Sequence, residues 1–185
     1  NYCLVRLHTY FFVPDQFGII SELYAYVAFF VVLLMLGMET TFFRFVNKSD
    51  DKEKTFNQAL SLVLIINTFF LITVLLFAQN IADWLAFPNH KDYIIWFAFI
   101  LVFDAISSLF MAKLRFEEKP KRFAIIQLSS IGVNIILNLF FLFVLLDDHL
   151  EFGIGFIFLA NLFSSLAKPL LLIKEISTFR FVFDK

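Results

Sequence analysis

The sequence predicts an all-α polytopic membrane protein, a bundle of about five complete transmembrane helices and the tail of a sixth. Of the 185 residues, 61% are hydrophobic and 17% are charged, whereas soluble domains average about 45–50% apolar and about 25% charged residues. Long apolar stretches recur along the chain, and nearly all Lys and Arg residues lie in alternate connections between them. Together these observations indicate a chain whose surface faces hydrocarbon.

Five stretches reach the roughly 20 apolar residues that a helix needs to cross a bilayer core of about 30 Å. They cover residues 19–46, 56–81, 93–112, 123–146 and 152–173. Residues 1–13 resemble the end of a further helix, and Pro14, Asp15 and Gly18 predict a turn after it. Because the chain begins at Asn1 inside an apolar run and shows no secretory signal, we expect it to be a piece of a larger protein.

Few charges interrupt these stretches. The second has none between Lys54 and Asp83, the third contains Asp104, the fourth has none, and the fifth contains Lys168 followed by Pro169. Proline lacks an amide donor and crowds the carbonyl four residues earlier, so we predict a kink or break at Pro169. Lys168 either reaches the cytoplasmic boundary with its long side chain or faces a cavity.

The distribution of Lys and Arg predicts the orientation. Twelve of the fifteen lie in one set of connections, at residues 44–54, 113–122 and 174–185, while the opposite set contains Lys91 alone. The Lys-rich connections should therefore be cytoplasmic, and the first complete helix should run from outside to inside. Trp84 and Trp96 lie near the predicted outer boundary, where indole rings favour the headgroup level.

Asp104 is the first candidate functional residue, because ionisable groups within a membrane usually face a protein interior or a hydrated cavity. It lies about 16 Å along the helix from Tyr93, near the predicted midplane. Two interpretations stay open. Either Asp104 binds a coupling proton or cation or braces a cavity, or it is a structural carboxylate that accepts a hydrogen bond from a neighbouring helix.

Two helices show polar stripes. The fourth stretch places amides and hydroxyls at steps of three and four residues: Gln127, Ser130, Asn134 and Asn138. The fifth repeats the pattern: Asn161, Ser164, Ser165 and Lys168. Such groups either hydrogen-bond across helices and stabilise their packing or line a hydrated path that accepts sugar hydroxyls.

Glu39 and Arg44 form the most distinctive pair in the first stretch. They are about 140° apart on a helix, so they are poorly placed to pair with each other. Glu39 should also lie near the helix C-terminus, where the dipole disfavours an anion. It therefore needs a partner from another helix or a proton, and we interpret the pair as part of a functional or gating cluster.

Composition and motifs exclude several functions. A net charge of −1 gives no field for nucleic acid, so we expect no nucleic-acid partner. Cys3 is the single cysteine, and no Cys and His cluster predicts a metal site. Neither HExxH, Walker A, GxGxxG nor a Ser/His/Asp arrangement is present in the sequence. We therefore expect no enzyme and no cofactor, apart from a coupling ion, H⁺ or Na⁺.

The sequence resembles polysaccharide-biosynthesis flippases of the Wzx type, in the superfamily that contains the MATE multidrug transporters and the lipid II flippase. The blocks that carry the resemblance are residues 1–10, 14–18, 22–26, 37–45, 104–108, 114–116 and 121–123. The block 37–45 reads Gly-Met-Glu-Thr-Thr-Phe-Phe-Arg-Phe. The likeness extends over residues 1 to about 175.

This resemblance implies a MATE-like transporter of 12–14 helices in two lobes that works by alternating access in the bacterial cytoplasmic (inner) membrane. Residues 1–175 would form the N-terminal lobe, with its first helix truncated, and residues 176–185 a cytoplasmic linker. The implied substrate is a polyprenyl-pyrophosphate-linked oligosaccharide for O-antigen, capsule or exopolysaccharide. Implied partners are membrane lipids, a polysaccharide polymerase and glycosyltransferases.

Roles for single residues follow from charge and predicted depth. Arg6, Arg44 and Lys168 are the cations that would meet the pyrophosphate, and Glu39 and Asp104 are candidates for coupling or gating. The cavity amides would be Gln127, Asn134 and Asn138. Two alternatives stay open: a cation-coupled multidrug antiporter of the MATE type, and a membrane-embedded enzyme or assembly subunit of the same glycan pathway.

Overall fold

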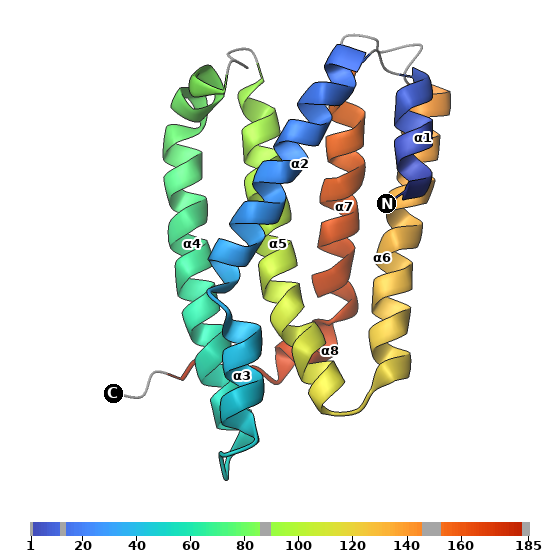
Figure 1. The fold of residues 1–185 in the computed structure, drawn as a ribbon. Coiled ribbons are helices and arrows are strands. Elements are labelled where there is room, and N and C mark those ends of the chain that lie inside the picture. Colours follow the sequence, from blue (N-terminus) through green and yellow to red (C-terminus); the bar gives the residue numbers. More distant parts are fainter. Residues whose placement is uncertain (1, 12–13, 86–89, 146–152, 183–185) are drawn as a thin grey trace.

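The computed structural model describes residues 2–11, 14–85, 90–145 and 153–182, and Figure 1 shows them as a helical bundle. Within these residues no strand occurs, which confirms the predicted all-α class. Some side chains between residues 2 and 19, including that of Arg6, lie outside the described part of the chain.

Four segments of the described chain are long and apolar enough to cross a membrane. The first segment, Ile20–Val46, comprises most of α2 (Pro14–Met35) and all of α3 (Met38–Val46). The others are α4 (Lys52–Trp84), α5 (Lys91–Phe116), and α6 (Pro120–Phe140) with its π-helical continuation η1 (Phe141–Leu145). The remaining helices are α1 (Tyr2–Phe11), α7 (Gly155–Leu171) and α8 (Ile173–Ser177). Helix α7 corresponds to the fifth predicted stretch; it is apolar overall, but its 17 residues are fewer than the roughly 20 that a membrane-spanning helix needs.

Helix starts follow local chemistry. The carboxylate of Asp51 caps α4 by accepting a hydrogen bond from the Lys54 amide at 2.9 Å. Helix α6 begins at Pro120 and α2 at Pro14, because the first helical position needs no amide donor. The predicted turn at residues 14–18 is therefore wrong, since these residues form the first turn of α2.

The first predicted span is interrupted. Leu36 and Gly37 both adopt positive φ angles, 46° and 64°, and they separate α2 from α3. Glycine takes this left-handed conformation without steric cost, whereas leucine does so rarely. The single helix expected over residues 19–46 is thus two helices, and Glu39 lies in the first turn of α3 rather than near a helix C-terminus.

Pro169 ends its helix less abruptly than predicted. Helix α7 continues through Pro169 to Leu171, and Leu172 then joins it to α8. The amide of Leu172 still donates to the carbonyl of Lys168 at 3.0 Å. The break therefore follows the proline by two residues.

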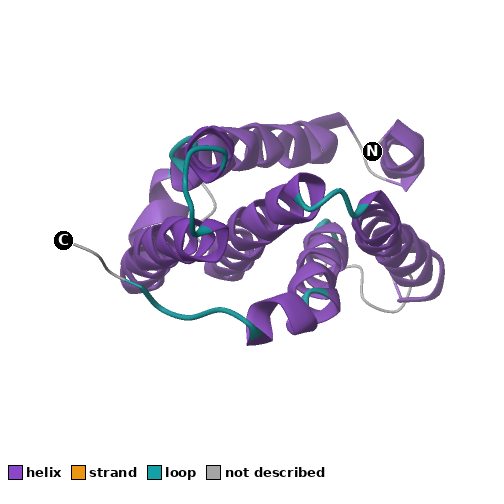
Figure 2. Ribbon diagram, turned by 90° about the horizontal axis from the view of Figure 1, so that it is seen from below, coloured by secondary structure: helices purple, strands orange, loops and turns teal. Residues whose placement is uncertain are grey.

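Helix α5 is the centre of the bundle. It packs against α4 on one side and α7 on another, α7 packs in turn against α6, and α2 crosses α5 obliquely (Figures 1 and 2). One cluster of large buried side chains lies near the N-terminal ends of α5 and α7, where Phe97 contacts Phe158. A second cluster, around Phe42, Phe56 and Phe110, lies at the opposite end.

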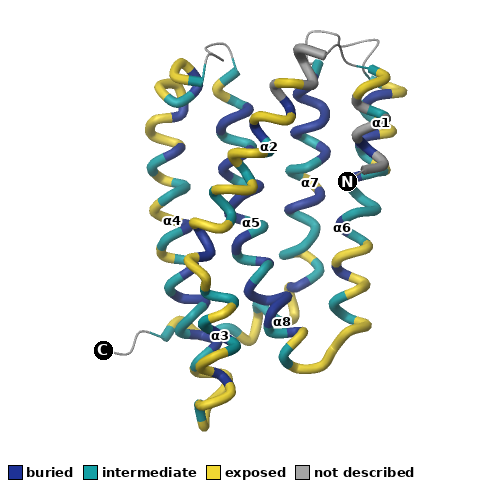
Figure 3. The backbone as a smooth tube through the Cα atoms, viewed as in Figure 1, coloured by how far each residue is buried: buried dark blue, intermediate teal, exposed yellow. Residues whose placement is uncertain are grey.

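The outer surfaces of the helices are apolar as well. Phe69, Leu76, Leu128 and Ile136 are among the exposed large hydrophobic side chains, and Figure 3 shows exposed residues along α2, α4 and α6. Contact of such a surface with lipid is favourable and its contact with water is not, so the chain is a multi-pass membrane protein. The Lys-rich connections gather at the end of the bundle occupied by α3 and α8, and their assignment to the cytoplasm stays a prediction.

Candidate functional site

A polar cavity of about 480 Å³ lies among α1, α2, α5, α6 and α7. Its polar lining comes from side chains on four of these helices: Ser21, Tyr24, Asp104, Gln127, Ser130, Asn134, Asn161, Ser164, Ser165 and Lys168. Leu4 is the described contribution of α1. The two predicted polar stripes therefore meet inside the bundle and form most of one wall.

The stripes of α6 and α7 hydrogen-bond to each other. The hydroxyl of Ser130 donates to the Ser164 carbonyl at 3.0 Å, and the Ser164 hydroxyl donates to the Ser130 carbonyl at 2.8 Å. One turn further along α6, the Asn134 amide donates to the side-chain oxygen of Asn161 at 2.9 Å, and Asn161 donates to the Tyr24 hydroxyl. The same groups thus hydrogen-bond across helices and line the cavity, and their contact with sugar hydroxyls stays a prediction.

Not every residue of the α6 stripe faces the cavity. Gln127 lines it. Asn138 is fully buried, does not belong to the lining, and donates to the Asn134 carbonyl of its own helix at 2.9 Å. Asn138 therefore contributes to packing, and its predicted contact with substrate has no counterpart in the cavity geometry.

Asp104 and Lys168 form an ion pair across the cavity wall. Lysine Nζ lies 2.9 Å from the Asp104 carboxylate, and the side chains of Lys168 and Asp104 are 21% and 24% exposed. Lys168 therefore points into the bundle instead of extending to the cytoplasmic boundary. Among the described residues that line the cavity, these two are the charged ones, so the pair sets the local electrostatic field.

Glu39 and Arg44 lie away from the cavity. The carboxylate of Glu39 accepts a hydrogen bond from Arg115 of α5 at 2.8 Å, which supplies the partner that the sequence required from another helix. The prediction that the helix dipole destabilises Glu39 is wrong, because Glu39 lies in the first turn of α3, where the dipole favours an anion. Arg44 is exposed, with its guanidinium 6.0 Å from the ring centre of Phe45. Their gating and pyrophosphate roles stay predictions.

Arg6 is placed by its backbone in α1, the helix whose Leu4 lines the cavity, but its side chain lies outside the described residues. Its predicted contact with pyrophosphate also stays a prediction. In the described part of the chain, no three His, Cys, Asp or Glu residues gather in a way that could hold a metal ion.

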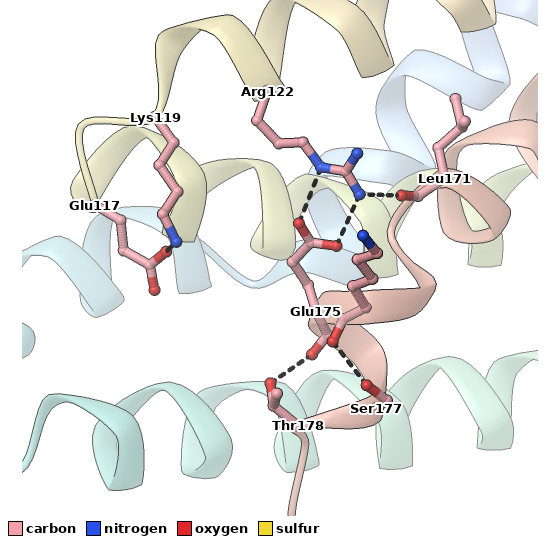
Figure 4. A network of polar contacts seen from close by, with 8 residues as sticks. Glu117, Lys119, Arg122, Leu171, Glu175, Ser177 and Thr178 are labelled. Atoms are coloured by element: carbon pink, nitrogen blue, oxygen red, sulfur yellow. Dashed lines mark hydrogen bonds and ion pairs between the residues drawn. The ribbon is translucent and has the colours of Figure 1, made fainter.

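A second polar contact, at the Lys-rich end, was not anticipated. Figure 4 shows Arg122 at the start of α6 reaching Glu175 of α8. Its guanidinium donates to the two carboxylate oxygens at 3.1 and 3.4 Å and to the carbonyl of Leu171 at 2.7 Å. In the sequence, Arg122 is one of the charges that predict the orientation, with no sign of its partner. Tyr24 gives no specific signal there, because it is an isolated tyrosine in an apolar run.

The apolar helices, and the polar side chains that line the cavity between them, define a multi-pass α-helical membrane protein with a partly polar interior. The chain belongs to the polysaccharide biosynthesis protein family, whose sequence model matches residues 6–169. Comparison with the curated proteins and with the solved structures gave no match. The match includes every described lining residue of the cavity except Leu4, and it confirms the resemblance to polysaccharide-biosynthesis proteins.

Proposed function

We propose that this chain forms the N-terminal lobe of a flippase that moves a polyprenyl-pyrophosphate-linked oligosaccharide from the cytoplasmic to the outer leaflet of a bacterial inner membrane by alternating access. Membership of the polysaccharide biosynthesis family supports the pathway. The observation that carries the transport step is the polar cavity of about 480 Å³ inside a bundle of membrane-spanning length. That volume is within the range of about 300–1,000 Å³ found for ligand sites.

The cavity chemistry suits a sugar. Saccharide hydroxyls both donate and accept hydrogen bonds, and so do the amides of Gln127, Asn134 and Asn161 and the hydroxyls of Ser130 and Ser164. These groups offer directional contacts with little net charge. They can therefore exchange hydrogen bonds with successive hydroxyls of an oligosaccharide without holding it too tightly to release.

The cation of the cavity suits the other end of the substrate. Lys168 is the described cation in the lining, and an ammonium group binds phosphate oxygens as a point charge. Arg6, in α1, and Arg44, near the Lys-rich end, are proposed as further contacts along the path of the pyrophosphate. Glu39, which pairs with Arg115, is proposed to act in gating at that end.

The decisive experiment uses a bacterial strain that lacks the complete gene and has no redundant flippase. Completed lipid-linked glycans should accumulate facing the cytoplasm, and the gene should restore their sidedness and the surface polymer. Asn134→Leu should fail to restore export, because it replaces a cavity amide with an apolar side chain.

Two further variants control for folding. Gln127→Leu changes the same cavity at an exposed lining position and should also reduce export. Ile136→Ala, on the exposed apolar side of α6, should restore export fully. Normal glycan sidedness and normal surface polymer in the deletion strain would refute the flippase function.

One observation favours a second candidate, a cation-coupled multidrug antiporter of the MATE type. Asp104 provides the cavity with a carboxylate, the group that binds an organic or coupling cation. This function requires cation-dependent efflux of small organic cations that is lost in Asp104→Asn, with normal glycan export in the deletion strain.

A further inference from the structure

The charges of the described cavity lining cancel. Asp104 on α5 and Lys168 on α7 are its charged lining residues in the described chain, and they pair at 2.9 Å. The groups that face them from other helices are the Tyr24 hydroxyl on α2 and the uncharged side chains of Gln127 and Ser130 on α6. Helix α4, on the other side of α5, has no charged residue between Lys54 and Asp83. Within the described lining, each member of the pair is therefore the counter-charge of the other.

The contact within the pair is minimal. An ammonium group has three N–H donors, and among the described residues Lys168 directs one of them to a single carboxylate oxygen. Both side chains are partly exposed beside the cavity. An anionic group that enters the cavity can therefore approach Nζ without first displacing a packed side chain.

An incoming anion creates a charge problem at this pair. If a phosphate oxygen takes the ammonium group, Asp104 loses its described cationic partner and lies beside the negative charge of the anion. Two neighbouring negative charges disfavour each other, and a proton on the carboxylate removes the repulsion. Binding of the anion and protonation of the carboxylate therefore favour each other.

From this geometry we infer that Lys168 exchanges the Asp104 carboxylate for a phosphate group of the substrate, and that Asp104 takes up one proton from solution as it is released. The ammonium and the phosphate keep their charges, so one proton enters for each anion bound. Because such coupling is reciprocal, deprotonation of Asp104 draws Lys168 back to the carboxylate and expels the anion. This exchange rests on the proposed flippase function, for which it names the phosphate-binding pair and the coupling ion.

The test uses the complete protein, purified in detergent, and a dialkyl pyrophosphate as the probe. This probe carries two fixed negative charges and, like the lipid-linked substrate, is esterified at both ends, so it does not titrate between about pH 5 and pH 8. Calorimetry in buffers of different ionisation enthalpy counts the protons taken up on binding. Binding should take up about one proton, and affinity should rise up to about tenfold for each unit of decrease in pH.

Variants separate the two members of the pair. Asp104→Asn, whose amide can still accept from Lys168, should bind the probe with no proton uptake and with an affinity independent of pH. Lys168→Met should weaken binding by about tenfold or more, since a charge-assisted hydrogen bond is lost, and Lys168→Arg should retain binding. Lys174→Met, an exposed lysine of α8 outside the cavity, is the matched control and should bind as the wild type does.

The outcomes also distinguish this exchange from the flippase function. Failure of the wild type to bind the probe, binding without proton uptake, uptake that persists in Asp104→Asn, or affinity that follows Na⁺ rather than pH would each overturn the exchange. The flippase function would fail separately, through normal glycan sidedness in the deletion strain.

Discussion

Two ion pairs between helices, one inside the membrane and one at the Lys-rich end, use their charges differently. Lys168 reaches Asp104 through one hydrogen bond beside a polar cavity. Arg122 reaches Glu175 through two hydrogen bonds and donates a third to the carbonyl of Leu171. The first pair therefore has a single hydrogen bond to exchange, whereas three hydrogen bonds hold Arg122 in the second.

The chemistry of the two cations explains this difference. A guanidinium group presents a rigid fork of donors that matches a carboxylate, while an ammonium group is a compact point charge on a flexible stem. Leu171 is the last residue of α7, and its carbonyl is one that a helix end leaves without an intrahelical partner. Arg122 therefore joins α6, α7 and α8 as a structural brace, and Lys168 is suited to exchange.

The strongest test of this contrast compares stability. Arg122→Met should lower the free energy of unfolding by about 1–3 kcal/mol, because Glu175 and the Leu171 carbonyl lose a shared donor. Asp104→Asn should cost less than about 1 kcal/mol, since its amide oxygen still accepts from Lys168 and the ammonium group is partly exposed beside the cavity. Chemical denaturation in detergent measures both, with Lys174→Met as control. Equal losses at the two sites would show that both pairs are structural.

A smaller effect is expected from pH. Burial raises the pKa of Glu175, but hydrogen bonding and attraction from Arg122, with help from Lys119, outweigh it, and the pKa lies below the ordinary value of 4.5. A lowered folded pKa means that the pair stabilises the protein fully above the ordinary value. The contribution is lost as pH falls through the folded pKa.

Thermal unfolding of the wild type and Glu175→Gln should therefore differ at neutral pH and converge in acid, below the ordinary glutamate pKa. The effect is smaller than that of Arg122→Met because protonation leaves the bond from Arg122 to the Leu171 carbonyl intact. A difference that stayed constant across this range would mean that the carboxylate charge contributes nothing to the brace.

The smallest effect concerns the uncharged contacts of the cavity wall. Ser130→Ala should cost about 0.6 kcal/mol, the average for a hydrogen bond between membrane helices. A double-mutant cycle with Ser164→Ala measures the coupling, and Ser129→Ala at the adjacent position is the control. A coupling energy above that of the Arg122 brace would reverse the assignment of structural roles.

The sequence predicted features that depend on local composition. Apolar length alone located the spans of α4, α5 and α6, and the spacing of Ser130 and Asn134 predicted a polar face that does lie inside the bundle. Such features follow from neighbours within a few turns. They need no knowledge of which helices meet.

Partners that lie far apart in the sequence were not predictable in the same way. Asp104 and Lys168 are separated by 64 positions, and Glu39 and Arg115 by 76. Periodicity indicates which face of a helix is polar but not which neighbouring helix that face meets, so the sequence does not predict these pairings. The break before α3 was missed because Leu36 is apolar, and Gly37 alone is a weak signal in a membrane helix.

The break at Leu36 and Gly37 divides the first span into α2, which can tilt about the break, and α3, which is attached to α5. Helix α2 has 22 residues and is therefore about 33 Å long. A change of about 10° at Leu36 and Gly37 swings its far end by about 6 Å and displaces Tyr24 by about 3 Å. Helix α3, tied to α5 through Glu39 and Arg115, stays in place during such a swing. A small change in the backbone torsions of these two residues is thus enough to reshape one wall of the cavity while the Lys-rich end keeps its packing.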